Sequence, residues 1–331
     1  MFRVPPRISR RRALQGLVAV VGVLAALLWW LNPFGKQELK GDLTFSTGVR
    51  TGVYHRYGQL LEQALASDLP GVKVRLRTSE GSQQNLQRVA DGEADFTVAT
   101  ADAVSKYRLD GKPGASRLRG VARLYDDYVQ LVVPAGSPVQ SARDLRGKRV
   151  AVGQDGSGVR LISERLLTAA KLDPTKDITP VAIGIDTMPA ELEAGRIDAF
   201  FWSGGLPTNA VRELSERFDI RLVQLGDLVE RLQASGSPAR YYRPAVMPQD
   251  AYARARNTSS VATLAVPNLL VTREDTSEAL TEQFTRTVIL SRDRIGHEVH
   301  AAQLVDLRTA IYTDPLDLHE GARRYYRSVK P

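Results

Sequence analysis

One stretch decides the fold class: Leu43-Thr44-Phe45-Ser46-Thr47-Gly48-Val49-Arg50-Thr51-Gly52-Val53-Tyr54. Its first five residues have the pattern of a strand, which ends at Gly48. A glycine-rich loop follows, and an amphipathic helical pattern then runs from Tyr54 to Ser67. The order is therefore strand, loop and helix.

The same order recurs along the chain. Further strand patterns lie at residues 72–76, 96–99, 129–133, 148–152, 197–202 and 221–225. Between them lie helical patterns or glycine-rich loops, namely Gly81-Ser82, the segment 153–158 and Ser203-Gly204-Gly205. Alternating strands and helices predict an α/β fold with a mostly parallel sheet.

The length of the chain predicts two lobes. With 331 residues, 43% of them apolar, it can bury enough surface for roughly two domains. Pro134 and Gly136-Ser137-Pro138 mark a break in the chain, residues 236–260 look irregular, and a strand pattern resumes at Val261. We predict a discontinuous lobe I of residues 42–133 and 262–331, and an inserted lobe II of residues 134–261.

The first 41 residues have the pattern of an export and anchoring segment. Arginines at positions 3, 7, 10, 11 and 12 precede an uncharged apolar run over residues 13–31, which ends in Trp29 and Trp30. The run is close to the roughly 20 residues that span a membrane as one helix. The positive-inside rule places the basic tail 1–12 in the cytoplasm, and the lobes beyond the linker 32–41 outside. We predict a single-pass cell-membrane protein with extracytoplasmic lobes.

Two alternatives concern this segment. No small-x-small cleavage site follows the run, which favours retention as an anchor over removal as a signal peptide. Ser9-Arg10-Arg11-Arg12 resembles a twin-arginine export signal, and a plain basic region is the other interpretation. The chain contains no cysteine, which excludes a lipid-modified cysteine, disulfides and thiolate chemistry. The tether is then the helix itself.

Charge and motif content argue against nucleic-acid binding and catalysis. The net charge is +8, but acidic residues lie between the basic ones and an extracytoplasmic location makes nucleic acid an unsuitable partner. The sequence lacks the HExxH, G-x-S-x-G, P-loop and dinucleotide-binding motifs. His297 and His300 are three residues apart, a spacing that a solvated helix face explains without a metal. We predict no enzyme activity, no catalytic residue, no metal and no cofactor.

The glycine-rich loops are the informative feature. Each follows a strand and precedes a helix, so that its backbone N–H groups and the positive end of the helix point at one place. One such loop alone is explained as a tight turn. Four on the same edge of a sheet predict a binding site for a carboxylate or another small anion, because ligands of open α/β sheets bind at the carboxyl ends of the strands.

The order of several blocks resembles the TAXI family, the solute-binding receptors of tripartite ATP-independent periplasmic (TRAP) transporters. The resemblance covers nearly all of residues 42–331. Its blocks are Thr47-Gly48 through Tyr54 and Gly58; Gly81-Ser82-Gln83-Gln84-Asn85-Leu86 with Gly92-Glu93-Ala94-Asp95; Asp144-Leu145-Arg146-Gly147-Lys148-Arg149-Val150; Gly156-Ser157-Gly158; Gly195-Arg196-Ile197-Asp198-Ala199-Phe200-Phe201; Pro207; Tyr252; Val266-Pro267-Asn268-Leu269-Leu270-Val271; and His319-Glu320-Gly321-Ala322 with Tyr325-Tyr326.

The resemblance implies a two-lobed type II periplasmic binding protein fold, with a cleft that closes on its ligand by hinge motion. It also implies ligands such as glutamate, glutamine or dicarboxylates. At Val49, Thr51, Val53 and Val159 the sequence departs from the family's usual residues, so the identity of the ligand stays open.

Thirteen residues are the candidates for ligand contact. Those expected in lobe I are Thr47, Gly48, Tyr54, Ser82, Thr100 and, for an ammonium group, Asp102; those expected in lobe II are Gly156, Ser157, Gly158, Arg160, Trp202, Ser203 and Gly204. Several have a structural alternative: a core position for Tyr54 and Trp202, a helix cap for Ser82 and Asp102, a strand-end position for Thr100, and surface exposure for Arg160.

These observations predict a receptor that captures a small anionic solute in an interlobe cleft and delivers it to TRAP permease subunits. The alternative is a membrane-anchored sensor, which presents its bound state to a membrane signalling protein.

Overall fold

The computed structural model describes residues 20–23, which are helical, and residues 39–329. Residues from Leu39 onward form one compact unit. The predicted membrane span 13–31 lies outside the described residues apart from 20–23, as do the tail 1–12 and most of the linker 32–41. Within the described ranges no helix combines the length and the apolar character needed to cross a membrane.

A ten-stranded sheet forms the centre of the unit. Its strands are β1 (Gly41–Ser46), β2 (Val72–Arg77), β3 (Phe96–Thr100), β4 (Leu118–Pro134), β5 (Arg149–Ala151), β6 (Thr179–Val181), β7 (Ala199–Gly204), β8 (Ile220–Val223), β9 (Arg243–Met247) and β10 (Val261–Arg273). The order along the sheet is β2-β1-β3-β10-β4-β7-β5-β6, with β8 paired to β4 and β9 paired to β10.

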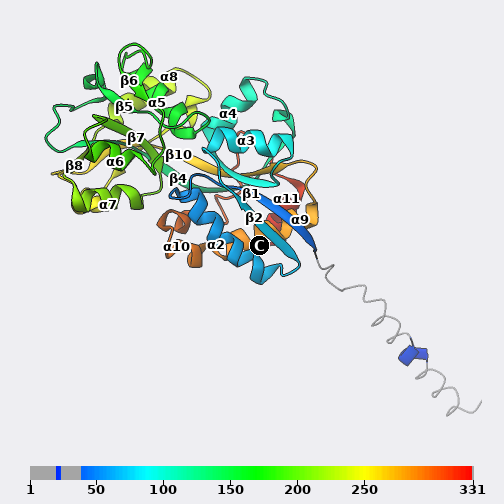
Figure 1. The fold of residues 1–331 in the computed structure, drawn as a ribbon. Coiled ribbons are helices and arrows are strands. Elements are labelled where there is room, and N and C mark those ends of the chain that lie inside the picture. The colour runs from blue at the N-terminus through cyan, green and yellow to red at the C-terminus, as the bar shows by residue number, and fades with distance from the viewer. Residues whose placement is uncertain (1–19, 24–38, 330–331) are drawn as a thin grey trace, which may run out of the picture. The chain divides into compact units, whose positions relative to one another are not determined.

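Two groups of parallel strands flank a long antiparallel pair. Strand β1 pairs in parallel with β2 and β3, and β5 pairs in parallel with β6 and β7. Between the groups, β4 runs antiparallel to β10, and Figure 1 shows this pair connecting the two ends of the sheet. β4 pairs with β10 as far as Tyr128, and from Tyr128 onward with β7.

Ten helices lie in the part of the unit that the structure describes. They are α2 (Val53–Asp68), α3 (Ser82–Asp91), α4 (Ala101–Leu109), α5 (Gly158–Ala169), α6 (Met188–Glu193), α7 (Asn209–Arg217), α8 (Val229–Ala234), α9 (Glu278–Leu290), α10 (Arg292–Gly296) and α11 (Glu320–Val329). Each of β1, β2, β3, β5, β6 and β7 is followed directly by a helix. The carboxyl ends of these strands therefore carry the strand-to-helix loops.

Helix α2 forms because its apolar residues recur at helical spacing. Tyr57, Leu60, Leu61, Ala64 and Leu65 are buried, and this spacing places them on one stripe. The stripe belongs to a hydrophobic cluster that also contains Phe45, Phe96 and Phe284. The rings of Phe96 and Phe284 stack with their centroids 4.1 Å apart, which fixes α9 against β3.

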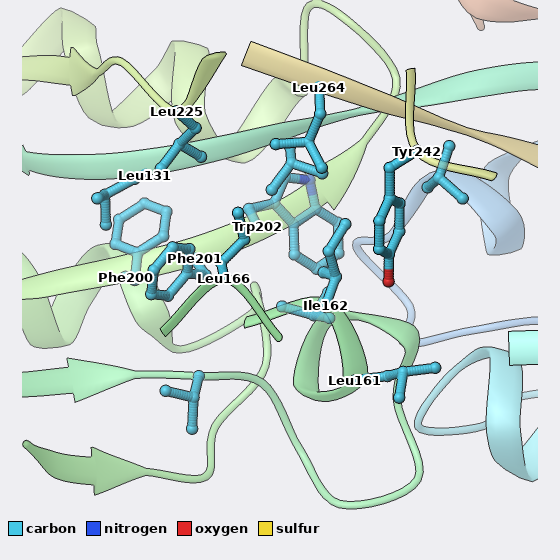
Figure 2. Close-up of a cluster of buried hydrophobic side chains, with 14 of the residues drawn as sticks. Leu131, Leu161, Ile162, Leu166, Phe200, Phe201, Trp202, Leu225, Tyr242 and Leu264 are labelled. Atoms are coloured by element: carbon cyan, nitrogen blue, oxygen red, sulfur yellow. The ribbon is translucent and has the colours of Figure 1, made fainter. Parts of the chain in front are cut away.

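The second cluster lies around β4 and β7. All six residues of β7 are buried, because the strand has neighbours on both edges and helices over its faces. Figure 2 shows Phe200, Phe201 and Trp202 of β7 beside Leu131 of β4 and Ile162 of α5.

The observed architecture is α/β, as predicted, but the sheet is mixed. Over residues 39–329 the structure has four parallel and five antiparallel strand pairings, so the expectation of a mostly parallel sheet is wrong. The predicted strand 129–133 is the end of β4, which begins at Leu118, and the segment 236–260 contains β9.

Candidate functional site

A cavity of about 60 Å³ lies where the parallel strands end. Its wall comes from the loops and helix starts after β1, β2, β3, β5 and β6, from the end of β7, and from Asp127 of β4. In this conformation the site suits a small solute.

Four helices begin at this wall. Gly52, Gly81, Thr100 and Ser157 are the N-cap residues of α2, α3, α4 and α5, and all four line the cavity. The N-caps of α2, α3 and α4 make no side-chain capping hydrogen bond, whereas the hydroxyl of Ser157 accepts one from the N–H of Arg160 at 3.0 Å. Converging helix N-termini concentrate positive potential, which attracts an anionic group.

The loop before α3 touches the loop before α5. The backbone N–H groups of Gln83 and Gln84 each donate to the carbonyl of Gly156 at 3.0 Å, and the side-chain amide of Gln83 donates to the carbonyl of Ser157 at 2.8 Å. Gly81 has φ +129°, and a Cβ there would lie 3.3 Å from the Cα of Ser157. Glycine permits both the backbone conformation and the close approach.

Hydroxyl groups form the side of the cavity nearest β3. The Ser82 hydroxyl accepts from the N–H of Thr100 at 3.2 Å and lies 3.3 Å from the Tyr54 hydroxyl. The Tyr54 hydroxyl donates to the side-chain oxygen of Asn268. Burial and the charge of Asp127 raise the pKa of Tyr54 well above its usual range, so this hydroxyl keeps its proton.

Apolar side chains form much of the remaining wall: Val49, Val53, Val159, Ile185, Met188 and Trp202. The indole N–H of Trp202 donates to the Thr208 hydroxyl at 3.1 Å, so its hydrogen-bonding capacity is already used. The ring therefore presents carbon surface to the cavity. This part of the wall suits a nonpolar part of a ligand.

Two carboxylates also line the cavity, Asp127 and Glu80, and its described wall contains no lysine, arginine or histidine. Asp127 is only 2% exposed. Burial raises its pKa to about 7; the Asn268 amide opposes this shift, and the charges of Asp126 and Asp102 add to it.

Comparison with protein families shows to which family the chain belongs. Residues 45–329 match the family described as NMT1-like. The chain belongs to the NMT1-like family. An ancestral arginine-binding protein has a similar structure, with 16% identity, a TM-score of 0.52, and coverage of 78% of this chain and 98% of that one. A putative L-cystine ABC transporter protein from Listeria monocytogenes matches with 15% identity, a TM-score of 0.51, and coverage of 81% and 99%.

These similarities give this NMT1-like protein an α/β fold of the periplasmic binding protein kind. Nine of the thirteen predicted residues lie together in the cavity wall: Gly48, Tyr54, Ser82, Thr100, Ser157, Gly158, Trp202, Ser203 and Gly204. They meet because the ends of β1, β2, β3, β5 and β7 face one point.

The other four predicted residues lie outside the wall. Thr47 is buried and donates to the carbonyl of Arg77 at 3.2 Å, and Gly156 offers its carbonyl to α3. Arg160 pairs with Glu164, its neighbour one turn along α5, and with Asp155 at 3.6 Å. Asp102 is paired with Arg165. The Glu164 carboxylate thus engages the guanidinium of Arg160, which was expected to contact an anionic ligand.

Sequence reasoning missed Asp127 and Glu80. Both are charged residues whose positions follow from strand pairing and loop contacts. One signal was present: Asp126-Asp127 is the only charged pair in a stretch, Leu124 to Val133, that is otherwise apolar except for Gln130. As for metals, the described residues include no group of three or more histidine, aspartate or glutamate side chains placed to hold an ion.

Proposed function

We propose that this protein is an extracytoplasmic receptor that captures a small solute bearing a carboxylate or another anionic group, without chemical turnover. The observation that carries the proposal is the convergence of four helix N-termini on one cavity. Backbone N–H groups and helix dipoles provide a fixed complement to an anion in a site with little water.

The proposed mechanism is closure of two lobes, with lobe I formed by residues 42–133 and 262–331, and lobe II by residues 134–261. In this arrangement β4 and β10 connect the lobes and act as the hinge. The hydrogen bonds from α3 to Gly156 then join the lobes in the closed state. Solute binding shifts the population toward this state, because only the closed form surrounds the solute.

For the partner, we propose a TRAP-type permease. The TAXI-like order of blocks supports this proposal. The similarity of the fold to that of proteins named as an arginine-binding protein and an L-cystine ABC transporter supports a role in solute transport, without favouring one permease type. We also propose that residues 13–31 anchor the protein to the cell membrane, with the lobes outside.

The test is thermal unfolding and calorimetry of the full chain in mild detergent, with a panel of small carboxylates and amino acids. At least one member should raise the unfolding temperature in proportion to its concentration and bind at a 1:1 ratio. If no member of the panel does either, the proposal is wrong.

Delivery is tested separately, by uptake of the best solute into vesicles that contain the permease. Uptake that requires this protein supports a transport receptor. Binding without uptake favours the alternative of an anchored sensor.

A further inference from the structure

Three acceptor atoms at the cavity have no protein partner. Within the described residues, Asp127 Oδ1, Glu80 Oε2 and the Ser203 hydroxyl are buried and make no hydrogen bond. All three side chains line the same cavity of about 60 Å³. Buried polar groups in native proteins are nearly always paired, so unpaired ones on the wall of one cavity indicate a missing partner.

The nearby cations are already engaged. Asp126, next to Asp127 on β4, pairs with Arg123 at 2.6 Å, and Asp102 lies 3.4 Å from the guanidinium of Arg165. No basic side chain belongs to the described part of the cavity wall. Asp127 is thus a buried carboxylate facing a cavity in which the protein supplies no cation, although a buried charge is normally paired.

The missing partner is a hydrogen-bond donor with positive charge. An ammonium group has three N–H donors and no acceptor, which suits a buried carboxylate whose Oδ1 atom is unpaired. Among the described residues no set of three or more metal-binding side chains exists, which leaves an organic cation.

We propose that the solute is a small α-amino acid with an aliphatic side chain, whose ammonium group binds Asp127. This inference rests on the proposed receptor function. The carboxylate of the solute then faces the N-termini of α2, α3, α4 and α5, and its side chain packs on Val49, Val53 and Trp202. The site thus binds a zwitterion, and a dicarboxylate lacks the group that Asp127 requires.

The experiment compares amino acids with the same molecules lacking the amine. The pairs are alanine and propionate, valine and 3-methylbutanoate, leucine and 4-methylpentanoate, and glutamate and glutarate. Calorimetry on the full chain should show that an aliphatic amino acid binds at least about 30-fold more tightly than its deaminated partner, because that partner leaves the carboxylate unpaired.

Two variants assign the preference to its residue. Asp127→Asn keeps the shape of the side chain and removes its charge, and it should reduce the preference for the amine to less than about 3-fold. Asp126→Asn is the matched control: Asp126 is the adjacent residue, it is paired with Arg123, and it lies outside the cavity wall. This control should keep the preference.

The outcomes separate the two proposals. Glutarate binding as tightly as any amino acid, or a preference that survives in Asp127→Asn, overturns the amino-acid inference and leaves a receptor for carboxylates. Glutamate as the tightest ligand, with its preference over glutarate lost in Asp127→Asn, keeps the ammonium site but overturns the aliphatic side chain. If none of the eight molecules binds, the receptor function and the inference fail together.

Discussion

Asp127 should destabilise the folded protein at neutral and alkaline pH. Its side chain is 2% exposed, and its pKa in the folded state is about 7, raised first by burial and then by the charges of Asp126 and Asp102. The other titratable groups that face it are Tyr54 and Tyr125, whose pKa values are raised well above their usual range by burial and, in part, by Asp127 itself. Both tyrosines stay neutral over the range that matters.

The size of the effect follows from the difference between the two states. The ordinary pKa is 3.8, so between this value and about 7 the folded state binds more protons than the unfolded state, and stability falls as pH rises. A difference of roughly three pKa units corresponds to about 4 kcal/mol well above pH 7. Between pH 5 and pH 8 the change from this one group is about 3 kcal/mol.

The variant Asp127→Asn should therefore gain about 3 kcal/mol relative to the unmodified protein between pH 5 and pH 8. For a unit of roughly 290 residues this is about 5 °C in unfolding temperature. Urea unfolding of the full chain without solute, at both pH values, measures it. Any cost of burying the amide is the same at both pH values, so the change with pH isolates the charge.

Asp144→Asn gives a comparison of opposite sign. Hydrogen bonds from the backbone N–H groups of Gln140 and Ser141 lower the pKa of Asp144, so its contribution is present above the unfolded pKa and is lost as pH falls. Loss of stability in this variant should be greatest at neutral pH. The reasoning about Asp127 is refuted if Asp127→Asn and the unmodified protein differ by the same amount at pH 5 and pH 8.

Three other outcomes are expected. Arg165→Met removes the cation 3.4 Å from the buried carboxylate of Asp102 and should cost about 3–5 kcal/mol in urea unfolding; a loss under about 1 kcal/mol contradicts this pairing. Ser157→Ala removes the N-cap of α5 and should cost about 1 kcal/mol of stability and weaken amino-acid binding. Ser277→Ala at the N-cap of α9 is the control and should leave the affinity measured by calorimetry unchanged. Equal affinities of the two variants contradict a role of Ser157 in the site. Amino-acid binding should release about one proton from Asp127 at pH 6 and almost none at pH 8.5, as calorimetry in two buffers measures; an identical proton count at both pH values speaks against the ammonium pair.

Local patterns predicted the elements whose neighbours in sequence explain them. The helix expected from Tyr54 to Ser67 is α2, Val53–Asp68, because its buried residues recur at helical spacing. The first half of β4 was missed, because Arg119 and Arg123 interrupt its apolar pattern. These side chains are partnered by Glu274 and Asp126, and β10 supplies the strand neighbour from about 140 residues further along the chain.

The same distinction between local sequence patterns and contacts distant in sequence holds for the residues of the site. Glycine and hydroxyl residues of the wall were predictable, because a loop between a strand and a helix has one place in an α/β sheet. Asp127 was not, because it reaches the cavity through the antiparallel pairing of β4 with β10, which sets Asp127 opposite Val266 and near Asn268. No pattern within β4 indicates which side chain of that strand will face the ends of β1 and β7.

The cavity brings together two features that a folded chain otherwise avoids: helix N-termini without side-chain caps, and a buried carboxylate, Asp127, with no basic side chain in the described cavity wall. In α3 the N–H groups of Gln83 and Gln84 already donate to the carbonyl of Gly156. A zwitterion satisfies both features, with its carboxylate at the helix ends and its ammonium group at Asp127. Tight binding then requires both charged groups of the solute.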